Sequence, residues 1–219
     1  MKRRRGRQST SSRPEPLYFD VGNWFRLIPF RFRGLSRSNR LELIVDPGPA
    51  FGIGDHPTTV MALELMEIAT ALLTDRKEDR TLLDVGTGTG VIAMASISLG
   101  MGFTVALDTD PCAVVCAKRN LILNGLWPDR RGASVEMVAG GVESIGGVFD
   151  VVVANLVAPV LIRIREHLEP RVGTYLILSG IADPLREEVF GVYESSGLEL
   201  VTSKKAGEWN SGLFARRLG

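Results

Sequence analysis

The sequence predicts an α/β fold: a doubly wound, mostly parallel, seven-stranded sheet that ends in an antiparallel edge hairpin. Short apolar runs alternate with longer helical segments from Thr81 onward, which is typical of parallel strands joined by crossover helices. A glycine cluster follows the first of these runs, where a strand would turn into a helix. The closing segment instead indicates two strands joined by a turn at Ala206-Gly207.

Each expected strand is a short apolar run bounded by glycine or polar residues. The strands are 81–85, 103–108, 133–140, 149–155 and 173–180, and the hairpin lies within 198–218. The expected helices carry start and stop signals: Pro111 suits a first helical turn, whereas Gly100 and Gly125 suit helix ends. The helices are 58–73, 91–100, 110–125, 159–170 and 184–197.

Charge is unevenly distributed along the 219 residues, although the net charge is only +1. Residues 1–40 hold eleven Lys and Arg against two acids, so this part carries +9 and the remainder −8. We expect 1–16 to be a basic disordered tail and 17–40 a short β-rich appendage with one or two strands. The arm could make weak, salt-dependent contact with rRNA phosphates, or it could serve only as a solubilising tail.

Composition excludes several classes of protein. No apolar run approaches the ~20 residues that a membrane span needs, and the basic start has no apolar segment of an export signal. The two cysteines, Cys112 and Cys116, lie one helical turn apart and support neither a disulfide framework nor a zinc site. We therefore expect a cytoplasmic protein without a metal or a membrane contact; the oligomeric state is left open.

The turn after the first strand carries the strongest chemical signal. Its glycines are Gly86, Gly88 and Gly90, and Val91 stands where a dinucleotide-binding fingerprint needs a further glycine. Asp84 would repel a pyrophosphate but can attract an ammonium group. The turn therefore favours a ligand with an amino-acid moiety over a dinucleotide.

The second strand ends in Asp108, whose carboxylate is suited to accept hydrogen bonds from a ribose diol. Asp84 and Asp108 could alternatively be turn or capping residues. Asp110 before Pro111 fits that capping role better, so ribose binding is assigned to Asp108. Thr87 is expected to line the site.

Asn155 ends the fourth strand, beside the glycine turn, where its amide oxygen could orient an amine. The alternative is a turn-forming Asn before a Pro-containing helix start. His56 precedes Pro57 in a tight loop and is interpreted as a hydrogen-bonded brace rather than as a catalytic group.

The glycine turn with its two acids resembles that of the class I S-adenosylmethionine-dependent methyltransferases, a Rossmann-like fold. More specifically, about 40–219 resembles the ribosomal protein L-eleven methyltransferase family, which modifies amino groups of a large-subunit stalk-base protein. The segments that carry the resemblance are "DPGPAFGIGDHPTT", "LLDVGTGTGVIAMASISLG", "LDTDP", "DVVVANLVA", "LSGI" and "GEW". Two departures are Ile53, where the family usually has Thr, and the first 40 residues, which we do not expect to form the family's N-terminal recognition domain.

The resemblance implies a methyltransferase domain at 41–219 and S-adenosyl-L-methionine as cofactor. The cofactor-binding residues that it implies are Phe51, Gly52, Thr58, Thr59, Asp84, Gly86, Thr87, Gly88, Gly90, Asp108, Thr109 and Asn155. The catalytic residues are Asn155 and Leu156, which would orient the acceptor amine. The expected function is N-methylation of a ribosomal or other protein; the alternatives are a methyltransferase for a small amine and a noncatalytic ribosome- or RNA-binding protein.

Overall fold

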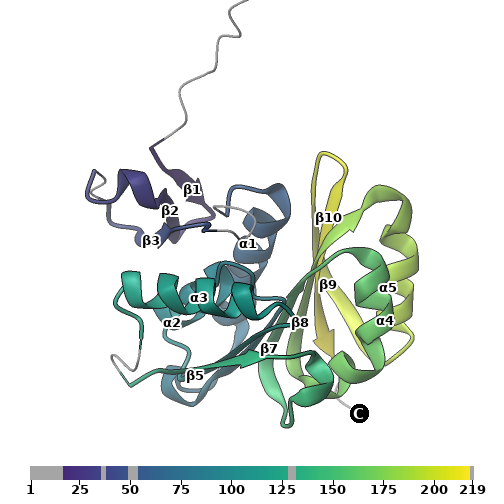
Figure 1. Cartoon of the computed structure of the whole chain (residues 1–219). Helices are drawn as coiled ribbons and strands as arrows, with labels where there is room; N and C mark the ends of the chain where they lie inside the picture. Colours follow the sequence, from purple (N-terminus) through teal and green to yellow (C-terminus); the bar gives the residue numbers. More distant parts are fainter. Residues whose placement is uncertain (1–16, 36–37, 49–53, 128–131, 218–219) are drawn as a thin grey trace, which may run out of the picture.

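The computed structural model describes residues 17–35, 38–48, 54–127 and 132–217, which form two sheets and their covering helices (Figure 1). The larger sheet has seven strands in the order β6-β5-β4-β7-β8-β10-β9. Neighbours from β6 to β8 pair in parallel, whereas β10 pairs antiparallel with both β8 and β9. The predicted fold class is confirmed, including the antiparallel edge hairpin.

The elements of this domain follow the predicted order. Its strands are Thr81–Val85 (β4), Phe103–Asp108 (β5), Ser134–Ala139 (β6), Phe149–Asn155 (β7), Val172–Ala182 (β8), Leu198–Ala206 (β9) and Trp209–Arg216 (β10). Its helices are Pro57–Leu72 (α1), Val91–Leu99 (α2), Pro111–Leu123 (α3), Ala158–Leu168 (α4) and Arg186–Glu194 (α5). The last helix is shorter than predicted at both ends: Asp183–Leu185 forms a 3-10 turn before it, and the helix ends at Glu194.

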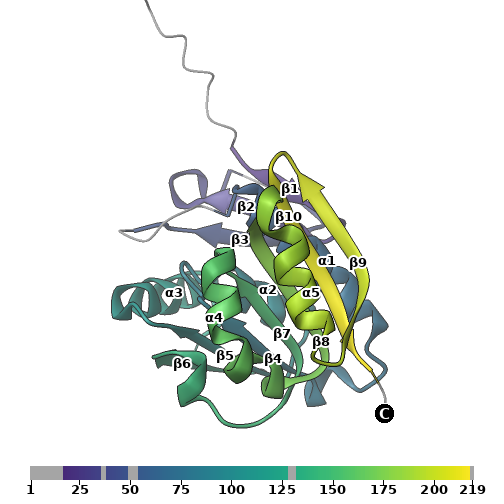
Figure 2. The ribbon, with the colours of Figure 1, turned by 90° about the vertical axis from the view of Figure 1, so that its right-hand side faces the viewer.

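Helices cover both faces of the large sheet. On one face α1 and α2 pack with the N-terminal strands in one core, and α4 and α5 lie together on the opposite face (Figure 2). Helix α2 has no polar side, since Val91 through Ile97 are all buried. The N-terminal strands cover the side of α2 that would otherwise face water. None of the described helices has the length and apolar character needed to cross a bilayer.

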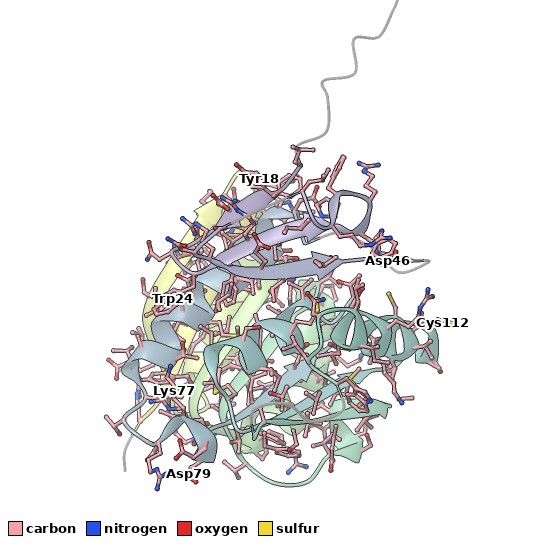
Figure 3. The ribbon with its side chains drawn as sticks, turned by 90° about the vertical axis from the view of Figure 1, so that its left-hand side faces the viewer. Tyr18, Trp24, Asp46, Lys77, Asp79 and Cys112 are labelled. Carbon is pink, nitrogen blue, oxygen red and sulfur yellow. The ribbon has the colours of Figure 1, made fainter. Side chains whose placement is uncertain are left out.

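The N-terminal sheet consists of Phe19–Val21 (β1), Phe25–Pro29 (β2) and Leu41–Val45 (β3). Strand β1 pairs antiparallel with β2, and β2 pairs in parallel with β3. Two strands therefore lie before residue 40, where one or two were expected, and they belong to a three-stranded sheet that continues to Val45. Figure 3 shows this sheet lying over the helices.

A buried carboxylate fastens the N-terminal sheet to α1. Glu67 is only 8% exposed and accepts hydrogen bonds from the backbone N–H groups of Asn23 and Trp24, both at 2.9 Å. These two amides lie in the turn between β1 and β2, and their bonds satisfy a carboxylate that burial would otherwise penalise. The small sheet is thus held by polar contacts as well as by the shared apolar core.

Candidate functional site

The strand order reverses between β4 and β7, and the segments that follow these two strands meet there. Gly86 follows β4 with φ of +77°, a conformation that glycine adopts without steric cost. A Cβ at this position would lie 2.5 Å from Cδ2 of Leu156, which follows β7. Glycine is therefore required at 86 both by the backbone and by a neighbouring side chain. Two cavities adjoin each other at this residue.

The larger cavity has a volume of about 360 Å³ and lies on the β5 side of Gly86. Asp108 and Thr109 line it from the end of β5, and 141–143 line it from the turn after β6. Leu156 and α4 close the opposite wall. A mostly apolar pocket of this size, with the carboxylates of Asp108 and Glu143 in its lining, suits a nucleoside.

The smaller cavity has a volume of about 200 Å³ and lies on the α1 side of Gly86. It is lined by Asp84 and Thr87 of the glycine turn, Thr59 of α1 and Asn155 of β7. Its walls therefore come from three separate segments of the chain. A larger share of its lining side chains is polar than in the larger cavity.

Asp108 is half-buried and fixes the glycine turn. Its Oδ2 accepts a hydrogen bond from the Gly88 N–H at 3.0 Å, and its Oδ1 accepts one from the Asp110 N–H at 3.0 Å. Each carboxylate oxygen has a second lone pair, so both can still accept a hydroxyl hydrogen. The carboxylate is thus pre-oriented to bind a diol in the larger cavity.

Asp84 is almost fully buried, with 2% of its surface exposed. Burial is the largest effect on its carboxyl group and raises its pKa from the ordinary value of 3.8 to about 7. The hydrogen bond from Thr87 Oγ1 to Asp84 Oδ2, at 2.6 Å, opposes this shift, and the nearby Asp108 charge adds to it. A cationic group in the smaller cavity would stabilise the ionised form of Asp84.

Asn155 and Thr59 lie opposite each other in the smaller cavity, with Asn155 Nδ2 donating to Thr59 Oγ1 at 3.3 Å. The next residue toward the start of α1, Thr58, is buried and bonds to His56. His56 caps the helix through Nδ1 and packs its ring edge-to-face against Trp209, with centroids 5.2 Å apart. These contacts support its interpretation as a brace.

The structure brings together most of the side chains expected at the site. Gly86, Asp108, Thr109 and Leu156 line the larger cavity, whereas Gly86, Asp84, Thr87, Gly88, Thr59 and Asn155 line the smaller one. Gly90 begins α2 and packs on Ala117 of α3. Phe51 and Gly52 lie outside the described residues. Leu156 and Asn155 are neighbours in the chain but line different cavities.

Comparison with known proteins identifies the family. The chain matches the family "Ribosomal protein L11 methyltransferase (PrmA)" over residues 18–217. The chain belongs to this family. Ribosomal protein L11 methyltransferases from Geobacter metallireducens and Pelobacter propionicus are each 39% identical to it, over 80% and 90% of this chain. The matches cover 54% and 62% of those relatives, so the chain spans little more than half of their length.

Solved structures agree with the fold of an L11 methyltransferase family member. The ribosomal protein L11 methylase from Lactobacillus delbrueckii subsp. bulgaricus superposes with a TM-score of 0.77 at 22% identity, covering 92% of this chain and 99% of that one. A magnesium protoporphyrin IX methyltransferase from Synechocystis superposes with a TM-score of 0.57 at 14% identity, covering 71% of this chain and 79% of that one. At these identities the superpositions show the shared fold.

Sequence reasoning missed two parts of the site in this family member. The turn at 141–143 lines the larger cavity, and a signal for it existed, because it follows the end of a predicted strand beside β5. Arg163 and Ile164 of α4 line the same cavity. Their place depends on how α4 crosses the sheet, which local sequence patterns do not specify.

Asn120 of α3 is a further residue that the sequence did not single out. Its amide accepts from the Asp46 N–H at 3.0 Å and donates to the Asp46 and Thr89 carbonyls, both at 2.9 Å. One turn later Asn124 pairs in the same way with the backbone of Ile44. The side chains of α3 thus act as a partner for the end of β3 and join it to the glycine turn. Asp46 and the start of α3 at Cys112 face the same side (Figure 3).

Proposed function

We propose that the protein is an S-adenosylmethionine-dependent N-methyltransferase that modifies an amino group of ribosomal protein L11. The observation that carries this proposal is the junction of a nucleoside-sized cavity and a polar cavity at Gly86, in a chain that matches the family over 18–217. Membership of the family supports both the reaction class and the choice of L11 as the acceptor. The lining of the two cavities supports the roles that we propose for individual residues.

The residues of the two cavities fit this cofactor. Asp108 would accept hydrogen bonds from the two ribose hydroxyls, and Leu156 and Val142, which line the larger cavity, would contact the nucleoside. Gly88 has φ of +53° and open space within 4 Å of where a Cβ would be, which leaves room for a ligand above the turn. Asp84, which lines the smaller cavity, would hold the ammonium of the amino-acid moiety. When bound, the cofactor supplies a methyl group activated by its sulfonium.

The acceptor amine binds on the Asn155 side. With Asn155 Nδ2 donating to Thr59, its Oδ1 is available to accept a hydrogen bond from the amine. This bond directs the lone pair of a neutral amine toward the cavity junction, and the proton of a lysine ammonium is released to solvent beforehand. Because positioning alone can contribute roughly 7–11 kcal/mol in favourable systems, no strong side-chain base is required.

Transfer of a labelled methyl group to purified L11 tests this function. We expect label in L11 with the wild type and none with Asp108→Ala, at equal concentrations of folded protein. Free lysine and a small aliphatic amine serve as competing acceptors. Label in these amines but not in L11 would indicate that the acceptor is a small amine rather than L11. Cofactor binding without label in any acceptor would instead favour a noncatalytic binding protein.

We further propose that the protein is cytoplasmic and that its basic N-terminal arm makes weak contact with rRNA. The basic tail at 1–16 lies outside the described residues. In the appendage, Arg31 and Arg33 stack on the rings of Phe32 and Phe30 at 4.9 and 4.0 Å from the centroids. Such exposed guanidinium groups can contact phosphates. Affinity for rRNA that falls steeply with salt would support the contact, and affinity insensitive to salt would refute it.

A further inference from the structure

Ser179 of β8 connects the two walls of the smaller cavity, although it is fully buried. Its backbone carbonyl accepts a hydrogen bond from the Leu156 N–H at 3.1 Å, and it is the register partner of Asn155. Its hydroxyl donates to the Thr58 carbonyl of α1 at 2.8 Å. One residue therefore holds both the segment that carries Asn155 and the helical turn that carries Thr59.

The hydrogen-bond directions in this cluster follow from the number of hydroxyl protons. Ser179 has one hydroxyl proton, and the Thr58 carbonyl can only accept. The second contact of Ser179 Oγ is with Ser211 Oγ of β10, at 2.5 Å. Ser211 must therefore donate to Ser179, which leaves Ser179 as the group in contact with α1. Both serines are fully buried, but only the Ser179 hydroxyl donates to α1, whereas the Ser211 hydroxyl donates to Ser179.

Gly180, the next residue, allows β8 to lie close to the acceptor segment. It has φ of +86°, and a Cβ there would lie 2.5 Å from the Leu156 carbonyl oxygen. A larger residue would push the Leu156 backbone away and break its bond to the Ser179 carbonyl. The Ser179-Gly180 pair thus fixes the segment after β7 through one hydrogen bond and one close approach.

We propose that Ser179 is a positioning residue for methyl transfer: its hydroxyl and carbonyl together set the distance between Thr59 of α1 and Asn155 of β7. Asn155 Nδ2 and Thr59 Oγ1 are 3.3 Å apart, so a small movement of α1 would break their bond and release the Asn155 amide. Ser179 lines neither of the two described cavities and acts only through these neighbours. This role rests on the proposed methyltransferase function.

The test compares Ser179→Ala with Ser211→Ala. Both remove a buried hydroxyl from the same pair, but only Ser179→Ala removes the bond to α1. We expect Ser179→Ala to lower kcat for L11 methylation by about 10- to 100-fold, because small displacements of aligned groups have effects of this size. The Kd for the cofactor should change by less than about threefold. Ser211→Ala should keep kcat within about twofold of the wild type.

Hydrogen exchange in the ligand-free protein gives a readout that does not depend on activity. The Thr59 and Val60 N–H groups both bond to the His56 carbonyl in the first turn of α1. Their exchange should accelerate in Ser179→Ala and stay unchanged in Ser211→Ala. If the wild type transfers no methyl group to L11, the proposed function fails, and this measurement still decides whether Ser179 holds α1.

The double variant Ser179→Ala/Ser211→Ala controls for the possibility that Ser179→Ala loses activity only because it is less stable. Removing both hydroxyls leaves no unpaired hydroxyl between β8 and β10, so this variant should be more stable than Ser179→Ala alone. It should nevertheless show the same loss of kcat. Equal kcat values for Ser179→Ala and Ser211→Ala, or a double variant with wild-type kcat, would overturn the positioning role.

Discussion

The two cavities beside Gly86 are built in different ways. The larger one uses the ends of β4, β5 and β6 together with Leu156 and α4, and the bond that fixes Asp108, donated by the Gly88 N–H, joins residues 20 apart in the sequence. The smaller one depends on bonds from Asn155 to Thr59, 96 residues apart, and from Ser179 to Thr58, 121 apart. The hydrogen bond that fixes the acid of the nucleoside side is thus more local in sequence than the bonds that hold the acceptor side together.

The two aspartates assigned to the cofactor, Asp108 in the larger cavity and Asp84 in the smaller one, lie in different environments. Asp108 is half-buried and bonded to two backbone amides, whereas Asp84 is enclosed and bonded to a threonine hydroxyl. We infer that Asp108 is pre-organised for neutral hydroxyls, and that Asp84 reaches its charged form most readily when a cation is present.

The largest effect that we expect concerns Asp84 and the free energy of unfolding. Its folded-state pKa, about 7, lies above the ordinary 3.8 of the unfolded chain. The contribution of Asp84 to stability is therefore fully present below about pH 4 and is lost as the pH rises to about 7. The loss is up to about 4 kcal/mol.

Urea unfolding of Asp84→Asn and wild type across this range measures the effect. The variant cannot titrate at this position, so its stability should fall less between pH 4 and pH 7 than that of the wild type. Parallel pH profiles for the two proteins would show that burial of Asp84 does not perturb its ionisation.

The next effect concerns cofactor affinity on the nucleoside side. Asp108→Ala removes two hydrogen bonds to a charged group, each contributing about 1.5–3 kcal/mol, so Kd should rise roughly 100-fold or more. Asp110→Ala is the matched control, because Asp110 only caps α3 by accepting from the Cys112 N–H. The control should lose about 1 kcal/mol of stability with little change in Kd. Calorimetric titration with S-adenosylmethionine would distinguish these outcomes.

The smallest effect concerns the junction itself. In Gly86→Ala the new methyl group would displace Leu156 and strain a backbone at φ of +77°. We expect roughly tenfold weaker cofactor binding, corresponding to about 1.4 kcal/mol. Gly207→Ala provides a control for backbone strain, since Gly207 has φ of +60° and no atom within 4 Å of where its Cβ would lie. Equal Kd values for both variants would contradict the role of the Leu156 contact.

The difference between the cavities also explains how much the sequence could predict. The strands β4, β5 and β7 have the predicted limits, because each is a continuous apolar run with a clear stop signal. The glycine turn and Asp108 follow directly from those strand ends. Ser179 and Asn120 could not be identified in this way, since their partners depend on how helices pack and how β10 enters the sheet.

Cofactor titration of Asn155→Ala and Asp108→Ala tests most directly whether Asp108 binds the cofactor while Asn155 orients the acceptor amine. Asn155 is placed on the acceptor side, so its variant should bind S-adenosylmethionine within about threefold of the wild type while kcat falls, because the amine is no longer oriented. Asp108→Ala should lose binding. If Asn155→Ala lost cofactor affinity to the same extent, Asn155 would bind the cofactor rather than the acceptor amine, and its placement on the acceptor side would be wrong.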